Sequence, residues 1–378
     1  MKFLKDKILE LRPLFNKGGK YEKFHTYFDG FATFLFTPDE VTHQGTHIKA
    51  GIDLKRTMFI VVIAMIPALL FGMWNVGHQH FLSLGEFTGI GDGFLDKFIY
   101  GALKVLPIVL VSYGVGLGVE FFIASKKGHP INEGFLVSGM LIPLIMPPAI
   151  PLWMVAVATI FAVIFAKEVF GGTGMNILNV ALVARVFLFF AYPTYMSGDV
   201  VWIAEKADGY SGATALANSI AGNPGFSAYD MFMGFIPGSV GETSKLMILI
   251  GAAILIFTGI GSWKVMASVL AGAGIMGLIF NAIGANEFMN VPFYNHFLMG
   301  GLMFGAVFMA TDPVTAAQTE RGKWYYGLLI GMMAVMIRVF NPAYPEGIML
   351  AILFGNVMAP LIDYFVVQAN IKRRLARA

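Results

Sequence analysis

A short loop of small residues holds the first group of side chains that could do chemistry in this chain. The loop reads Asp208-Gly209-Tyr210-Ser211-Gly212-Ala213-Thr214, so a flexible backbone presents two hydroxyls and one carboxylate. It is not a phosphate-binding P-loop, because no lysine follows the glycines and no strand is expected before them. Taken alone, these residues predict a glycine-rich turn.

A second polar group, Thr173, Asn176 and Asn179, stands at the start of an apolar segment. Asn176 and Asn179 are three residues apart, so a helix would place them on one face. The free N–H groups of its first turn would lie at the same end. The group could therefore bind a polar ligand. The alternative is that it caps the helix and makes amide contacts between membrane helices.

Four carboxylates lie within or at the ends of apolar segments. Charged groups at membrane depth are costly and usually functional, and carboxylates suit hard cations, by analogy including Na⁺. Two of the four have simpler explanations: Glu168 adjoins Lys167 and could form an interfacial ion pair, and Asp312 precedes Pro313 and could begin a turn. The four are Glu120, Glu168, Asp312 and Asp363.

Three glycines, Gly114, Gly116 and Gly118, precede Glu120. Glycines at every second position do not form one stripe along a helix, because helical neighbours are three or four residues apart. They indicate either close packing or an irregular segment.

The composition sets the class of protein that must position these groups. Of 378 residues, 57% are hydrophobic and only 13% are charged, about half the charged share of a soluble domain. These values exclude a soluble enzyme, a disordered chain and a nucleic-acid-binding protein. The chain has no cysteine, which excludes disulfides and thiolate-bound iron–sulfur clusters, and we expect no metal site. A cleavable signal peptide is not expected, because the N-terminus is basic and polar.

The apolar runs are continuous, which predicts membrane helices and not a β-barrel. We expect ten spans, at about 56–75, 99–123, 135–149, 152–170, 176–192, 244–262, 264–284, 296–311, 324–340 and 347–368.

The basic residues predict the orientation of these spans. Of 26 lysines and arginines, 20 lie at the two termini or at every second connection between the ten spans, and so all on one side of the membrane. By the positive-inside rule, this is the cytoplasmic side. Both termini are then cytoplasmic, and the long loop 193–243 lies outside. Loops of that length are usually functional.

The two halves of the chain resemble each other. FLVSGMLI at 135–142 matches FLMGGLMF at 297–304, and IFAVIFAKEVF at 160–170 matches IGMMAVMIRVF at 330–340. The apolar run breaks after each second match, at 171–174 and 341–347. With five spans per half, the second half would be inverted, as in transport folds that bind ligands between the repeats.

The predicted fold is therefore an all-α polytopic membrane protein of ten transmembrane helices in two inverted five-helix repeats. Its parts are an N-terminal segment 1–55, the repeats 56–192 and 244–368, the loop 193–243 and a basic tail 369–378.

The loop ending at Thr214 matches the flavin-attachment motif Asp-x-x-Ser-Gly-Ala-Thr at every fixed position. The chain thereby resembles a family that includes the B subunit of the bacterial Na⁺-translocating NADH:quinone reductases and the D subunit of the related Rnf complexes. The polar N-terminal segment favours the first of these. Other matching segments are Asn132–Phe135, Ala166–Gly174, Phe235–Ser244 and Ala310–Val314.

The resemblance implies two flavins. FMN would be bound covalently, through its phosphate, to the Thr214 hydroxyl, with Asp208, Ser211, Gly212 and Ala213 completing the motif. A phosphoester needs an accessible hydroxyl, which the small residues before Thr214 supply. Riboflavin would be bound noncovalently by Thr173, Asn176 and Asn179.

The resemblance also implies sites for ions and quinone. Glu120 and Asp363 would lie on the Na⁺ path, and Gly116 and Gly118 would lie near the quinone. From its position inside the fifth span, and not from the resemblance, we expect Arg185 to pair with one of the four span acids or with a flavin.

The function implied is that of an integral subunit of a six-subunit, sodium-pumping NADH:ubiquinone reductase in the bacterial inner membrane. NADH would be oxidised on a partner, and electrons would pass through FMN and riboflavin to ubiquinone. Two alternatives stay open. One is an Rnf-type subunit working with ferredoxin and NAD⁺. The other is a flavin-free channel or secondary transporter built on the repeat.

Overall fold

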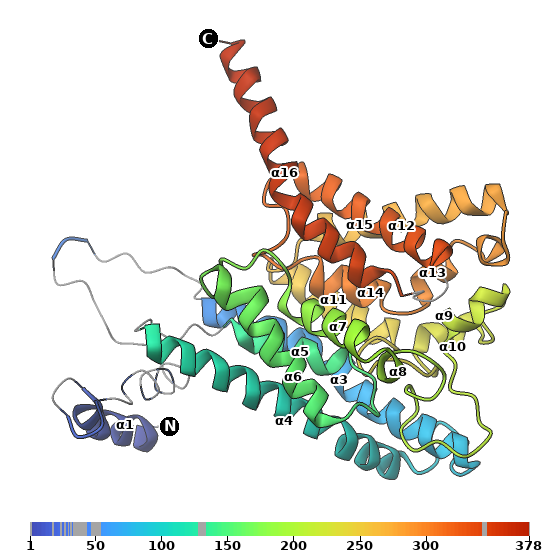
Figure 1. Cartoon of the computed structure of the whole chain (residues 1–378), viewed down its shortest axis with the longest axis horizontal. Coiled ribbons are helices and arrows are strands. Elements are labelled where there is room, and N and C mark those ends of the chain that lie inside the picture. Colours follow the sequence, from blue (N-terminus) through green and yellow to red (C-terminus); the bar gives the residue numbers. More distant parts are fainter. Residues whose placement is uncertain are drawn as a thin grey trace.

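The computed structural model in Figure 1 consists of helices, with no strand among the residues that it describes. Parts of three predictions lie outside those residues: much of the segment 1–55, Asn132 with Glu133 of a matching motif, and 342–345 in the second break. The described residues are 2–16, 19–22, 25, 28, 30, 32, 44–46, 54–127, 134–341 and 346–377.

Six helices are long and apolar enough to cross a membrane, which takes about 20 residues. They coincide with the predicted spans one, two, four, seven, nine and ten, and they confirm an all-helical, multi-pass membrane protein. They are α3 (Leu54–Leu84), α4 (Phe94–Lys127), α6 (Leu152–Ala162) with a π-helical and a 3-10 turn that extend it to Phe170, α12 (Trp263–Ile283), α15 (Gly322–Phe340) and α16 (Ile348–Leu375).

The other four predicted spans are short or broken, so ten complete transmembrane helices are not confirmed. A helix of 13 residues, the longest of them, is about 20 Å long, well below the ~30 Å of a hydrocarbon core. These segments are α5 (Phe135–Leu144), α7 (Val180–Ala191), α11 (Lys245–Phe257) and a broken stretch of α13 (Asn295–Leu298), α14 (Leu302–Phe304) and the π-helical turn Gly305–Met309.

Prolines and glycines explain why these segments are short. α5 ends three residues before the pair Pro147-Pro148, because a proline disfavours helical geometry at the preceding residue. Gly300, with a φ of +59°, interrupts the stretch between α13 and α14. Gly171, Gly172 and Gly174 also have positive φ, so the chain turns before α7 and delays its start to Val180.

The long loop between α7 and α11 is folded over one end of the helices and contains short helices of its own. One of its contacts with the helices is at exposed Glu205, which accepts hydrogen bonds from Lys104 (2.5 Å) and Tyr100 (2.9 Å) of α4. These bonds hold the pKa of the Glu205 carboxyl below its usual value. The shorter helices are α1 (Lys2–Phe15), α8 (Pro193–Met196), α9 (Ala215–Asn218), η4 (Ser219–Ala221), α10 (Ala228–Met233) and η5 (Glu287–Asn290).

Glycines allow the closest helix pairs to form. α12 and α15 touch through backbone, since a Cβ added at Gly331 would overlap the carbonyl oxygen of Val269, and one at Gly272 would overlap that of Leu328. α3 and α4 meet in the same way at Gly77 and Gly101. Small residues at helix contacts are the usual means by which membrane helices associate.

Replacement of Gly331 by leucine will therefore push α15 away from α12. We expect a cost of about 1–3 kcal/mol, as for other overpacked interiors, measured as a lower unfolding temperature of the detergent-solubilised protein. Gly114→Leu is the matched control, because a Cβ at Gly114 meets no atom within 4 Å. Equal unfolding temperatures for the two variants would contradict this packing.

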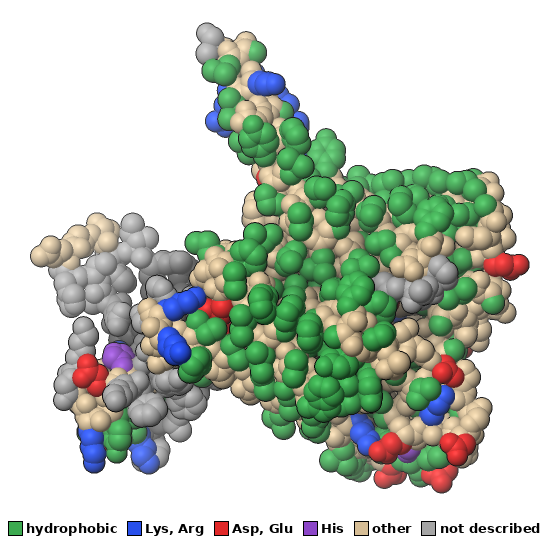
Figure 2. Space-filling model, viewed as in Figure 1, with side chains coloured by type: hydrophobic (Ala, Val, Ile, Leu, Met, Phe, Trp, Pro, Cys, Tyr) green, Lys and Arg blue, Asp and Glu red, His purple; other side chains and the backbone are tan. Residues whose placement is uncertain are grey.

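The helix ends form two groups. We call one the basic end; it includes Lys127, Lys264 and Lys323. The other is the loop end, which includes residues 193–243. At the basic end Lys264 and Lys323 both donate to exposed Glu320 and hold the pKa of its carboxyl down to about 2. Figure 2 shows hydrophobic side chains over the middle of the visible face and most charged side chains near its edges. This distribution suits a protein that spans a bilayer.

Candidate functional site

The first candidate site is the loop that ends at Thr214. Thr214 is half-buried and precedes α9, and its hydroxyl oxygen accepts a hydrogen bond from the N–H of Ala217 (3.2 Å). Ser211 is exposed and accepts from the N–H of Ala213 (3.4 Å). Gly212 is required, because a Cβ there would lie 2.5 Å from the carbonyl oxygen of Asp199. The predicted glycine-rich turn is therefore present, and Thr214 also has a capping role that the sequence analysis did not identify.

A cavity lies beside Thr214 at the loop end, and we call it the loop-end cavity. Its walls come from α7, the long loop, the start of α11 and the turn before α16. Apolar and aromatic side chains form one part of its wall and polar side chains the other. The polar and aromatic residues that line it include Phe189, Trp202, Thr214, Ser239, Glu242, Thr243, Lys245 and Glu346.

Arg185 is at the centre of a buried ion cluster, and its partners Ser239, Glu242 and Glu346 line this cavity. It is 3% exposed and donates to Glu242 (2.7 Å), to Ser239 (3.3 Å) and to Glu346. Arg185 is on α7 and Glu346 lies two residues before the start of α16, so the cluster connects the two halves of the chain. Neither acid was among the four that the sequence analysis singled out, because both stand outside the apolar runs.

Two further buried cations bind backbone carbonyls next to this cluster. Lys245 donates to the carbonyls of Glu242 (2.7 Å), Thr243 (3.2 Å) and Gly300 (3.1 Å). Arg338 donates to the carbonyls of His296 (2.7 Å) and Met299 (3.1 Å) in the broken stretch. A sequence signal for Arg338 existed, since the internal repeat aligns it with the charged residue Glu168.

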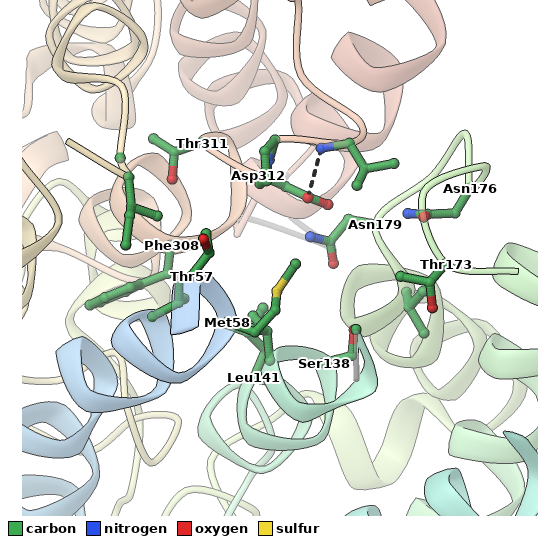
Figure 3. A pocket seen from close by; sticks show the side chains of 18 of the residues that line it. Thr57, Met58, Ser138, Leu141, Thr173, Asn176, Asn179, Phe308, Thr311 and Asp312 are labelled. Atoms are coloured by element: carbon green, nitrogen blue, oxygen red, sulfur yellow. Dashed lines mark hydrogen bonds between the residues drawn. The ribbon is translucent and has the colours of Figure 1, made fainter. Parts of the chain in front are cut away.

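The second candidate site is a cavity at the basic end, shown in Figure 3, which we call the basic-end cavity. It brings together side chains from segments far apart in the sequence. Its apolar wall includes Met58, Leu141 and Phe308. Its polar lining includes Thr57, Ser138, Lys167, Thr173, Asn176, Asn179, Thr311 and Asp312.

The structure corrects the local geometry predicted for Asn176 and Asn179. α7 begins at Val180, so Asn176 lies in the loop before the helix and the two asparagines do not share a helix face. They nevertheless line the same cavity with Thr173. The prediction was wrong because the glycines at 171–174 hold this stretch out of the helix.

Asn179 does what the capping alternative predicted. Its side-chain oxygen accepts from the N–H of Leu182 (3.2 Å) at the start of α7, and its side chain also hydrogen-bonds Asp312. Asn176 is less constrained: its amide donates to the carbonyl of Leu178 (3.3 Å) and lies at the cavity wall. Of the two, Asn176 is therefore the better placed to bind a ligand.

Glu120 and Lys167 form a buried ion pair between α4 and the end of the α6 segment. Their side chains are 6% and 5% exposed. Lys167 is the last residue of a π-helical turn and also lines the basic-end cavity. Glu120 is thus buried and charge-compensated.

The remaining three span acids have structural partners. Glu168 forms an ion pair, as expected, but with Lys127 (3.4 Å) and not with the adjacent Lys167, which pairs with Glu120. Asp312 accepts from Val314 (3.1 Å) and Thr315 (3.0 Å), which confirms the expected turn. Asp363 accepts from the backbone N–H groups of Gln318 (2.7 Å) and Thr319 (3.0 Å), so it holds the loop before α15 against α16.

The three glycines of α4 have two environments. A Cβ at Gly116 would overlap the ring of Phe135, so Gly116 allows α5 to pack on α4. Gly114 and Gly118 have open space beside them. Close packing therefore explains Gly116. The quinone site at Gly116 and Gly118 stays a prediction.

Comparisons with known proteins cover almost the whole chain. It is 48% identical to the B subunit of the Na(+)-translocating NADH-quinone reductase of Chromohalobacter salexigens, over 99% of this chain and 96% of the relative. It is 50% identical to the proteins of the same name from Stutzerimonas stutzeri and Azotobacter vinelandii, in each case over 96% of both chains. The NQR2, RnfD, RnfE family matches residues 41–372. The chain therefore belongs to the NQR2, RnfD, RnfE family.

Proposed function

We infer that this chain is the membrane-embedded B subunit of a sodium-translocating NADH–quinone reductase. The observation that carries the inference is the pair of cavities at opposite ends of the helices, one beside Thr214 and one beside Asn176. A protein that passes electrons between two flavins needs two such sites. The identity to reductase subunits over 96–99% of the chain supports this reading, and it favours it over the Rnf-type alternative.

At the loop end, Thr214 would carry FMN through a phosphoester. The donor set fits, because the hydroxyl stands on a backbone of small residues beside a cavity with aromatic and polar walls. Bound there, the flavin supplies one- and two-electron chemistry, while this chain supplies its position and electrostatic environment.

At the basic end, riboflavin would bind among Thr173, Asn176 and Asn179. Hydroxyls and amides suit the polar edge of a flavin ring, and Met58, Leu141 and Phe308 suit its faces (Figure 3). Lys167 brings a cation to the same cavity.

The architecture that we propose is two inverted five-segment repeats, 56–192 and 244–368, joined by the outer loop 193–243. Matching contacts support it: in both halves the third segment contacts the first, second and fifth, the second contacts the fourth, and the fourth contacts the fifth. The third segment is short or broken in both halves. Discontinuous helices at a repeat interface are typical of transport folds.

We propose the location, the orientation, the electron path and the Na⁺ path on the same basis. The chain would lie in the bacterial inner membrane with the basic end, the segment 1–55 and the tail 369–378 in the cytoplasm. Electrons from NADH, oxidised on one of five partner subunits, would reach ubiquinone near Gly116 and Gly118. Na⁺ would be exported along a path that includes Glu120 and Asp363.

Two measurements on the wild-type complex test the proposed function. On a denaturing gel, the band of this chain should fluoresce as a flavin, and the complex should reduce quinone with NADH at a rate that rises with Na⁺. A dark band would favour the flavin-free transporter. Reduction of NAD⁺ by ferredoxin would instead identify an Rnf-type complex.

Replacement of Asn176 by leucine will weaken riboflavin binding. We expect about tenfold weaker binding, because one hydrogen bond to a ligand contributes ~1–1.5 kcal/mol. The measurement is the flavin released by acid from the purified complex, compared with the covalent flavin that stays on the gel band. Asn370→Leu, at an exposed position of α16 on the basic end, is the control. Equal riboflavin release by both variants would argue against a site at Asn176.

A further inference from the structure

The buried ion cluster at the loop end has more cations than anions. Arg185, Lys245 and Arg338 contribute three formal positive charges, and Glu242 and Glu346 contribute two negative ones, which leaves an excess of one positive charge among these five. All but Glu346 are at most 6% exposed, and the side chain of Glu346 is 15% exposed. An uncompensated charge in such surroundings is costly, and an anion nearby relieves the cost.

The loop-end cavity lets a ligand reach this cluster. Lys245, Glu242 and Glu346 line the same cavity as Thr214. Gly300 and Gly301 let the charged side chains pack directly against the backbone, since a Cβ at Gly300 would lie 3.3 Å from the guanidinium of Arg338 and one at Gly301 would overlap the carboxylate of Glu242.

A second observation points to a ligand in the cavity. The hydroxyl of Thr243 is buried, with the residue 3% exposed, and it has no hydrogen-bond partner among the described residues. Thr243 lines the loop-end cavity. Buried polar groups nearly always have partners, so the unpartnered hydroxyl of this cavity-lining residue is available to donate to a group bound there.

We propose that the excess positive charge of this cluster, together with the Thr243 hydroxyl, stabilises the negative charge that a flavin tethered to Thr214 gains on reduction. The inference rests on the proposed function, in which NADH supplies the electron through the partner subunits. One electron added without a proton adds one negative charge to the cavity, which the excess charge of the cluster balances. Lys245 is then a charge-compensating residue and Thr243 a hydrogen-bond donor.

The test is a potentiometric titration of the purified complex, followed by flavin absorbance. The component of the absorbance change that is lost in Thr214→Ala belongs to the tethered flavin. The midpoint potential of this component is the quantity to compare among the variants. Lys245→Met should make this potential more negative, and Glu346→Gln should make it more positive. Each change should alter the ratio of reduced to oxidised flavin at a fixed potential roughly tenfold, about 59 mV for a one-electron couple.

Two further variants complete the set. Thr243→Val keeps the shape of the side chain and should move the potential in the negative direction by less than Lys245→Met. Lys104→Met is the matched control, because Lys104 is also a loop-end lysine but pairs with exposed Glu205, and it should not move the potential.

The opposite signs separate this proposal from general damage to the fold. Shifts of Lys245→Met and Glu346→Gln in the same direction, or unchanged potentials in both, would overturn it. Unchanged potentials together with a weaker fluorescent band would also overturn it. In that case the cluster would bind the FMN phosphate during attachment and would not stabilise the reduced ring. A dark band in the wild-type chain would refute the proposed function itself. If Lys245→Met does not fold, the proposal is tested by the opposite shifts expected for Glu346→Gln and Thr243→Val.

Discussion

Thr214→Ala will abolish flavin fluorescence of the denatured chain, because alanine has no hydroxyl to form the phosphoester. Thr214→Ser keeps a hydroxyl and should retain fluorescence at least in part. The fold should survive both changes: loss of the cap on α9 costs about 1 kcal/mol, and α9 is only four residues long. Gel fluorescence and the mass of the intact chain measure the result.

The nearby hydroxyl of Ser211 provides the control for attachment at Thr214. Ser211 is exposed and lies three residues earlier in the same motif, so an unspecific transfer of flavin would use it. Ser211→Ala should leave the fluorescent band intact. A fluorescent band in Thr214→Ala, or its loss in Ser211→Ala alone, would move the attachment to another residue.

Lys167→Met will strongly destabilise the protein, because it leaves the carboxylate of Glu120 buried without its cation. Breaking a buried pair by removing one partner costs about 3–5 kcal/mol. The unfolding temperature of the solubilised complex should fall by several degrees. The variant should also unfold least readily at low pH, where protonation of Glu120 removes the unpaired charge.

A neighbouring ion pair supplies a matched control. Lys127 and Glu168 also connect α4 to the end of the α6 segment, but the Lys127 side chain is 44% exposed. Exposed pairs contribute at most about 1 kcal/mol, so Lys127→Met should change the unfolding temperature little. The double variant Lys167→Met with Glu120→Met should regain much of the lost stability, and a double variant as unstable as the single one would contradict the pair's role.

The sequence predicts the long helices well, because their signal is local. Within the predicted span 56–75, residues 58–74 are apolar without interruption, and α3 extends beyond the span at both ends. The short helices are harder to predict. The run 135–149 is as apolar as its neighbours, yet α5 ends at Leu144. Membrane helices sometimes tolerate prolines, and α5 contains Pro143 but ends before the pair Pro147-Pro148.

The polar sites also include some that the local sequence predicts and some that it does not. The motif at 208–214 and the residues Thr173, Asn176 and Asn179 are recognisable from short stretches. The structure brings Thr214, the last residue of the motif, to one cavity and the other three residues to the second. The pairing of Arg185 with Glu346 joins residues 161 positions apart. Such a contact depends on the packing of α7 against α16, which no local pattern contains.

The two cavities have a consequence for how the membrane voltage is distributed. Leu141 lines the basic-end cavity. One helical turn further along α5, the carbonyl of Leu144 accepts from Gly241 (2.7 Å), whose neighbour Glu242 lines the loop-end cavity. Water in both cavities would leave a dry barrier around Leu144 of about one helical turn, the Leu144–Gly241 hydrogen bond and one further residue, roughly 10 Å in all. Most of the voltage would then fall across that barrier, so an ion crossing it would exchange nearly the full ~2.3 kcal/mol per 100 mV in a single short step.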